Sequence, residues 1–126
     1  MDLKEYKFAE THEWAREEDG LVIMGISDFA QEQLNDIVFI DLPETGQAVS
    51  KGEEILTVES TKTASAIHSP VSGTIEEVNT ELESAPEMIN ESPFEEGWIV
   101  KISPDSPDEL GSLLSYEDYK KLAEES

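Results

Sequence analysis

The residue best suited to covalent chemistry is Lys62, an amine in a strongly acidic chain. It lies between two segments, residues 54–60 and 63–68, whose patterns predict strands, and only one other basic residue, Lys51, occurs between positions 16 and 101. A lysine at an exposed tip between two strands is a compact, flexible amine that a second protein can reach. Spacing alone leaves two interpretations open: attachment of a mobile cofactor, or an ordinary solvated lysine.

Other kinds of active site are disfavoured by what the chain lacks. It has no cysteine, which excludes disulfides, thiolate zinc sites, iron–sulfur sites and cysteine nucleophiles. His12 and His68 are the only histidines, and the sequence around His12 lacks the second histidine of a zinc-protease helix. No glycine-rich phosphate loop or nucleophile elbow occurs. We therefore expect no metal and no catalytic residue, in a protein that is not itself an enzyme.

The charge balance limits the classes of partner. Against 8 Lys and Arg stand 30 Asp and Glu, a net charge of −22. Such a surface repels phosphate, so nucleic acids and anionic membranes are unfavourable partners. Proteins with basic faces remain, because opposite charge raises the rate of encounter. The acidity also has a simpler interpretation, namely that it keeps a monomer in solution or reflects a salty cell.

Length and patterning predict one mostly-β domain. A chain of 126 residues suits a single domain, and its apolar residues mostly recur with period two. Asp19-Gly20 predicts a two-residue hairpin, and Ser27 is placed to cap a short helix. Near the end, Ser106 with Glu109 predicts a capping box, and residues 116–124 predict a further helix. We see no signal peptide or apolar run long enough to span a membrane, and expect a cytoplasmic protein.

The motifs around Lys62 resemble the H-protein of the glycine cleavage system. The resemblance covers nearly the whole chain, in order and at matching spacing. Its segments are Thr11-His12-Glu13-Trp14, Gly25-Ile26-Ser27, Val38 to Pro43, Glu59-Ser60-Thr61-Lys62, Ser69 to Gly73, Glu77-Val78-Asn79, Leu82 to Asn90, Gly97 to Ile102 and Ser106 to Leu110.

The resemblance implies a fold and a carrier function. The expected fold is all-β, a barrel-sandwich hybrid with a short helix in the N-terminal half and a helical tail. One lipoyl-carrier domain would span residues 1–126, with a lipoyl-type core at roughly 21–103 and the tail at roughly 106–125. Lys62 would carry lipoate through an amide bond and shuttle the aminomethyl group of glycine. The implied partners are glycine decarboxylase, aminomethyltransferase, dihydrolipoyl dehydrogenase, and a lipoate ligase or lipoyl/octanoyl transferase.

The resemblance also assigns roles to residues around the arm. Thr11 and Glu13 stand where the family shelters the loaded arm in a cleft, and we expect Glu13 to pair with the arm's ammonium. Glu59, Gly46 and Gly73 are expected to help lipoylating enzymes recognise the site. From the residues alone, Glu13 is equally a surface carboxylate, Glu59 a charge at a strand end, and Gly46 the glycine of a turn.

Two departures from the family pattern leave the cleft chemistry open. Thr61 replaces the usual aliphatic residue before the lysine, and Ala66 replaces a common acidic residue four positions after it. The alternative function is a lipoyl-relay protein that delivers lipoyl groups to 2-oxoacid dehydrogenase complexes. A biotin carrier would have methionines beside the lysine, where Thr61 and Thr63 stand. A structural interaction domain with an inert Lys62 is the remaining alternative.

Overall fold

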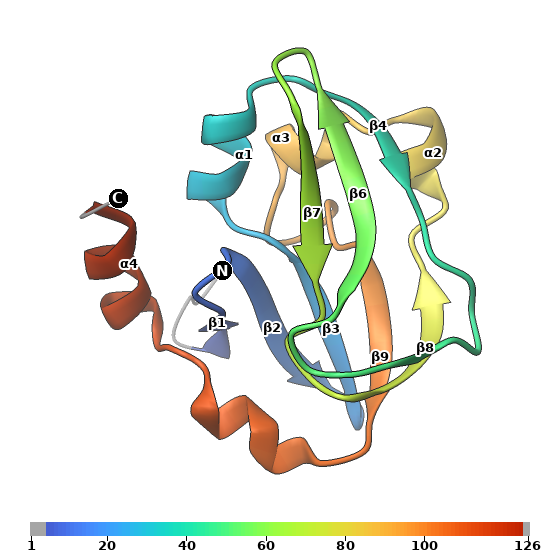
Figure 1. Ribbon diagram of the computed structural model, residues 1–126, viewed down its shortest axis with the longest axis vertical. Coiled ribbons are helices and arrows are strands. Elements are labelled where there is room, and N and C mark those ends of the chain that lie inside the picture. Colours follow the sequence, from blue (N-terminus) through green and yellow to red (C-terminus); the bar gives the residue numbers. More distant parts are fainter. Residues whose placement is uncertain (1–4, 125–126) are drawn as a thin grey trace.

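The computed structural model describes residues 5–124 as two antiparallel sheets with short helices at their margins (Figure 1). The larger sheet has six strands in the order β1 (Lys7–Phe8), β2 (Glu13–Glu18), β3 (Leu21–Ile26), β9 (Val100–Pro104), β8 (Gly73–Val78) and β5 (Ala48–Val49). The smaller sheet has three strands in the order β4 (Ile37–Asp41), β6 (Glu54–Ser60) and β7 (Ala64–His68). The all-β fold class with a sandwich of sheets is confirmed.

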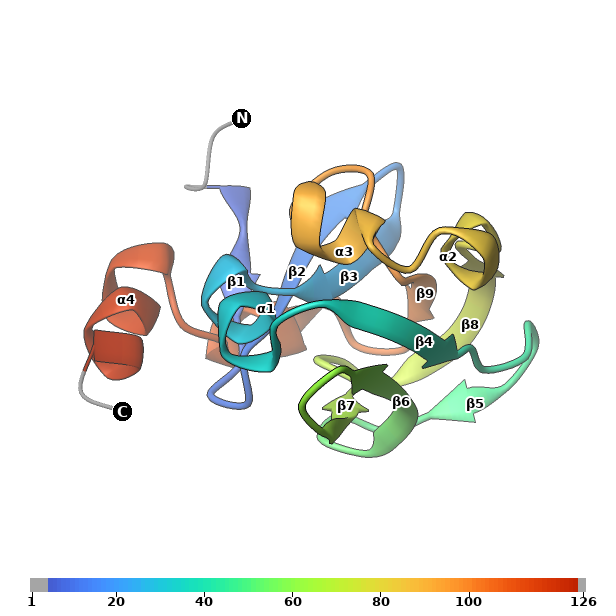
Figure 2. The ribbon, with the colours of Figure 1, turned by 90° about the horizontal axis from the view of Figure 1, so that it is seen from above.

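The two sheets pack face to face around an aliphatic core (Figure 2). Val22, Met24 and Ile102 contribute from the larger sheet, and Val58 and Ile67 from the smaller one, all nearly inaccessible to water. The alternation of apolar and polar residues along the strands places these side chains on the inner faces. The strand pairing therefore fixes which residues of β7 point inward and which remain outside.

The predicted hairpin and first helix are confirmed. Asp19 and Gly20 have φ of 53° and 81° and connect β2 to β3, as a two-residue turn with positive φ requires. Helix α1 (Asp28–Leu34) begins after Ser27, whose Oγ accepts a hydrogen bond of 3.1 Å from the Ala30 amide. The polar segment 81–90 forms two single-turn helices, α2 (Glu81–Ser84) and α3 (Met88–Glu91).

The helical tail is confirmed, but one detail of it is wrong. It consists of a 3₁₀ helix, η2 (Pro107–Ser112), and helix α4 (Tyr116–Glu124); residue 125, the predicted end of the tail, lies outside the described residues. Ser106 makes no side-chain capping bond. The Glu109 carboxylate instead accepts bonds from the Ser72 amide (2.8 Å) and hydroxyl (3.2 Å), because tertiary contacts there replace the local cap. None of the described helices is long and apolar enough to cross a membrane.

Helix α4 docks on an aromatic cluster at the edge of the larger sheet. Tyr119 is 1% exposed and its ring stacks on Phe8, with centroids 4.6 Å apart and planes 9° from parallel. Its hydroxyl lies 2.5 Å from Ser27 Oγ and 2.8 Å from His12 Nδ1. Trp14 is buried in the same cluster, whereas Trp98 is only partly buried against it. One phenol thus ties the tail to the start of α1 and to the segment before β2.

Replacement of Tyr119 by phenylalanine is expected to lower the free energy of unfolding by about 1–3 kcal/mol, because it leaves the buried Ser27 hydroxyl without its tyrosine partner. Thermal or urea unfolding measures the change. Tyr116→Phe is the matched control, since Tyr116 lies in the same helix and no hydrogen bond of its hydroxyl is seen to any described residue. Equal stability of the two variants would contradict this account of how the tail is held.

Candidate functional site

Lys62 occupies the tip of the hairpin formed by β6 and β7, the uppermost turn in Figure 1. Ser60 organises this turn. Its amide donates to the Thr63 carbonyl (2.8 Å), and its hydroxyl donates to the same carbonyl (3.0 Å) while accepting from the amides of Lys62 (3.1 Å) and Thr63 (3.0 Å). One donor and two acceptor sites are all that a hydroxyl offers, so its hydrogen-bonding capacity is fully used. The backbone beneath the lysine is therefore held in one conformation.

A second contact holds the tip from the side. The Thr61 amide donates to the Asp36 carbonyl over 3.0 Å, which joins the tip to the segment leading into β4. Lys62 itself is exposed, and its amine forms no ion pair or hydrogen bond with any residue between 5 and 124. The arrangement is a free amine on a fixed backbone. The roles of Ser60 and Asp36 in holding this turn were not predicted from the sequence. Serine is, however, a residue type that often forms turns by hydrogen-bonding to the nearby backbone.

A cleft of about 270 Å³ opens beside the same hairpin, between β7 and α1. Its lining is mostly apolar and comes from the turn before β2, from the end of β3, from α1 and from β7: Thr11, His12, Ile26, Phe29, Ala30, Gln33, Leu34, Ser65, Ala66 and Ile67. Strand β7 begins two residues after Lys62, so the amine lies directly beside the strand that forms one wall of the cleft. An apolar cleft with a few polar groups is the usual environment for an aliphatic ligand.

Thr11 lines the cleft, whereas Glu13 lies behind it. The Glu13 side chain is fully buried. Its Oε2 accepts from the His68 amide (2.9 Å) and lies 3.2 Å from His68 Nδ1, and its Oε1 accepts from the Thr11 hydroxyl. The carboxylate thus connects β2 of the larger sheet with the end of β7 in the smaller sheet. Only the Thr11 hydroxyl, which is hydrogen-bonded to this carboxylate, lies between it and the cleft surface.

His12 is a cleft residue that sequence reasoning did not identify. Its backbone has a positive φ of 79°, and its ring packs 5.2 Å from that of Phe29. Burial lowers the pKa of His12 below its usual value, although the nearby Glu13 opposes this, and burial raises the pKa of Tyr119 to about 12. Both groups of the His12–Tyr119 pair are therefore neutral at pH 7, and His12 adds no positive charge to the cleft wall.

The three residues expected to serve in recognition do not lie together. Glu59 is exposed on β6, three residues before Lys62. Gly46 lies in the connection between β4 and β5, at the end of β4 away from the tip, with a φ of 88° that favours glycine. Gly73 is buried, and a Cβ there would lie within 2.2 Å of the Ser103 carbonyl oxygen, so close strand approach requires glycine.

The two departures from the family pattern lie on opposite sides of the turn. Thr61 is exposed at the tip, where its amide makes the contact with Asp36. Ala66 lines the cleft, so the wall formed by β7 contributes no carboxylate there. The remaining acidic group close to the cleft on the β2 side is Glu13. A cationic ligand in the cleft would therefore be attracted by the negative charge of Glu13, which lies behind Thr11.

Comparison with known proteins agrees with this architecture. The family model for the glycine cleavage H-protein matches residues 6–126. The chain is 56% identical over 121 residues to a glycine cleavage system H protein of Saccharophagus degradans, covering 95% of this chain and 93% of the relative. It is 49% identical over 119 residues to the mitochondrial protein of that name from Pisum sativum, covering 94% and 72%.

A solved structure also matches over nearly the whole chain. The crystal structure of a glycine cleavage system H protein from Mycobacterium marinum superposes with a TM-score of 0.86 at 38% identity, covering 94% of this chain and 95% of that one. Sequence and fold therefore agree over nearly the entire length. This chain belongs to the glycine cleavage H-protein family.

Proposed function

We propose that this protein carries lipoate on Lys62 and serves the glycine cleavage system as a carrier and not as a catalyst. The observation that supports it best is the unpaired amine of Lys62 on a turn whose backbone is fixed by Ser60. The residues present fit the group, because an exposed amine can be acylated and the apolar cleft beside β7 can receive an aliphatic arm. When bound, a lipoyl group supplies a disulfide that takes up a one-carbon unit together with two electrons.

Attachment of the lipoyl group requires little of this protein except that an enzyme can reach the Lys62 amine. The neutral amine of Lys62 attacks the carbonyl carbon of an activated acyl donor, and the amide C–N bond forms. The bond to the activating group breaks and its electron pair leaves with that group, while the nitrogen loses a proton to solvent. The fixed tip keeps the amine in reach throughout. We propose that Glu59, Gly46 and Gly73 contribute to recognition, Glu59 by direct contact and the glycines by maintaining the backbone around the hairpin.

The cleft is proposed to shelter the loaded arm from water. Apolar side chains of α1 and β7 exclude water, which protects a carried amine from hydrolysis. The neutral His12 does not repel a cation, and the carboxylate of Glu13, behind Thr11, attracts one. We propose that Glu13 pairs with the arm's ammonium when the Thr11 hydroxyl turns aside. The Thr11 hydroxyl stays at the cleft surface in either arrangement.

The proposed partners are glycine decarboxylase, aminomethyltransferase and dihydrolipoyl dehydrogenase, with a lipoate ligase or lipoyl/octanoyl transferase for loading. A net charge of −22 steers basic faces of such proteins toward this one. Location in the cytoplasm and a monomeric state remain predictions. A second candidate function, relay of lipoyl groups to 2-oxoacid dehydrogenase complexes, is favoured by Ala66, which leaves β7 without a carboxylate in the cleft.

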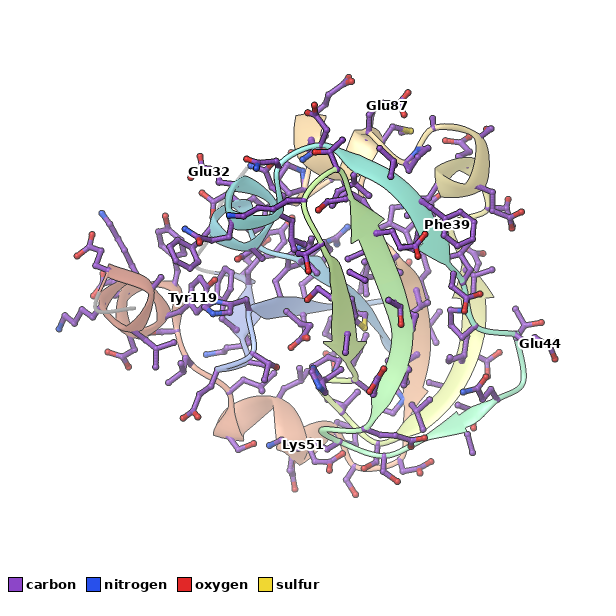
Figure 3. All side chains as sticks on the ribbon, turned by 45° about the horizontal axis from the view of Figure 1, so that its top comes forward. Glu32, Phe39, Glu44, Lys51, Glu87 and Tyr119 are labelled. Carbon is purple, nitrogen blue, oxygen red and sulfur yellow. The ribbon has the colours of Figure 1, made fainter. Side chains whose placement is uncertain are left out.

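The two functions separate in a reconstituted assay. We expect the lipoylated protein to support exchange of the carboxyl carbon of glycine with bicarbonate by glycine decarboxylase. Lys62→Arg should abolish the exchange, because arginine accepts no lipoyl group. Lys51→Arg is the control, since Lys51 is also exposed and lies at the opposite end of the molecule (Figure 3). Transfer of label from Lys62 to an acyltransferase domain, without exchange activity, would replace glycine cleavage by the relay function.

Glu13→Gln is expected to release the carried amine to water about tenfold faster than the wild type. The substitution retains the size of the side chain but removes the charge, and a charge-assisted contact contributes about 1.5–3 kcal/mol. Ammonia release from isolated, loaded protein measures the rate. Glu10→Gln, the same change at an exposed position before β2, should release at the wild-type rate. Release by Glu13→Gln at that same rate would remove Glu13 from the arm's environment and leave it a structural role only.

A further inference from the structure

Val38 and Phe39 form an exposed apolar pair on β4, next to the hairpin that carries Lys62. They are 53% and 51% exposed and are the only large hydrophobic residues among residues 5–124 that are so exposed. Their neighbours Ile37 and Ile40 are each only 2% exposed. Two consecutive outward residues break the alternation of a regular strand, and they coincide with an irregularity in the pairing of β4 with β6 between Ile37 and Phe39. Such a β-bulge redirects side chains and is a specific feature of a sheet.

The strand register places this pair in one surface with the hairpin. Phe39 lies opposite Glu59, which lies opposite Ala64, so these three residues form a row across β4, β6 and β7 on the outer face. The next row is Asp41, Thr57 and Ala66. We call these two rows together with Val38 the β4 face. Because Ala64 and Ala66 have small side chains, little protrudes from the β7 side of this face. Glu59 is three residues from Lys62, a separation of roughly 10 Å in an extended chain.

The charge of the β4 face is entirely negative. Asp41 and Glu59 lie within it, and Asp36 and Glu44 flank β4 at its two ends, all of them exposed. Figure 3 shows Phe39 on the outer side of β4 and Glu44 beyond the strand's end. No lysine or arginine occurs in β4, β6 or β7. A second copy of this chain would bring like charges together, whereas a partner with an apolar pocket and a basic rim would match.

The short distance between the β4 face and Lys62 indicates which of the proposed partners would bind there. An enzyme that acts on the far end of a long arm can work away from the hairpin. An enzyme that acylates Lys62 must bring its own catalytic centre to the amine, so its contacts fall within a few residues of the tip. We propose that the β4 face is the docking surface for the acyl-transferring enzyme that loads Lys62, with Phe39 and Val38 entering an apolar pocket edged by lysine or arginine. This inference rests on the proposed carrier function.

The test compares lipoylation of two apo proteins by a purified lipoate ligase with lipoate and ATP. Val38→Thr/Phe39→Thr places β-branched side chains suited to a strand at both positions but removes the apolar pair. We expect its KM as acceptor to rise about tenfold or more, as for loss of an interface anchor, with kcat at saturation within about twofold. Leu21→Thr, an apolar-to-polar change in β3, should retain the wild-type KM. Circular dichroism verifies that each variant folds.

A wild-type KM for the folded double variant would overturn the proposal. If that variant does not fold, Asp36→Asn/Asp41→Asn takes its place. We then expect a several-fold rise in KM that becomes smaller at high salt, and a wild-type KM would contradict the proposal. A wild-type dimer that Val38→Thr/Phe39→Thr disperses in sedimentation would assign the face to a second copy instead. Absence of lipoyl on wild-type Lys62, with a ligase that lipoylates another acceptor, would reject the carrier function itself and not the docking surface alone.

Discussion

A buried carboxylate, that of Glu13, holds the hairpin of Lys62 against the rest of the molecule. It belongs to the six-stranded sheet, and it accepts the amide of His68 at the end of β7 in the three-stranded sheet. Burial of a charge is unfavourable unless hydrogen bonds replace its hydration, and here His68 and Thr11 provide them. Because this contact lies at the base of the hairpin and the Ser60 turn lies at its tip, both ends of β7 are fixed.

The fixed position of β7 would serve two requirements of the proposed carrier function at once. In the proposed function, the amine must project where other proteins can reach it, and an arm attached to it would need shelter close by. One strand meets both requirements, because Lys62 precedes β7 while Ser65, Ala66 and Ile67 form a wall of the cleft. The opposite wall is α1, whose start is held by Ser27 and, through Tyr119, by the C-terminal helix. The helical tail is thus part of the support of the cleft.

Local signals in the sequence predicted the elements well, and long-range contacts explain what they missed. Asp19-Gly20 and Ser27 act within a few residues, so their hairpin and cap followed from residue type. The capping box predicted at Ser106 does not form, because the Glu109 carboxylate instead accepts hydrogen bonds from Ser72, 37 positions away in the sequence. The cleft and the neutral His12 arise from packing of three distant segments, which no local pattern encodes. The exposure of Val38 and Phe39 results from a bulge, and a period-two pattern predicts one of them buried.

The central claim is that one free amine on a fixed turn is the attachment point of a mobile group. The most direct measurement is intact mass followed by peptide mapping of protein produced with lipoate and a lipoylating enzyme. The account predicts a single lipoyl increment confined to the peptide that contains Lys62, with Lys51 and every other lysine unmodified. An increment on another lysine, or none on Lys62 while the enzyme modifies a control acceptor, would contradict it.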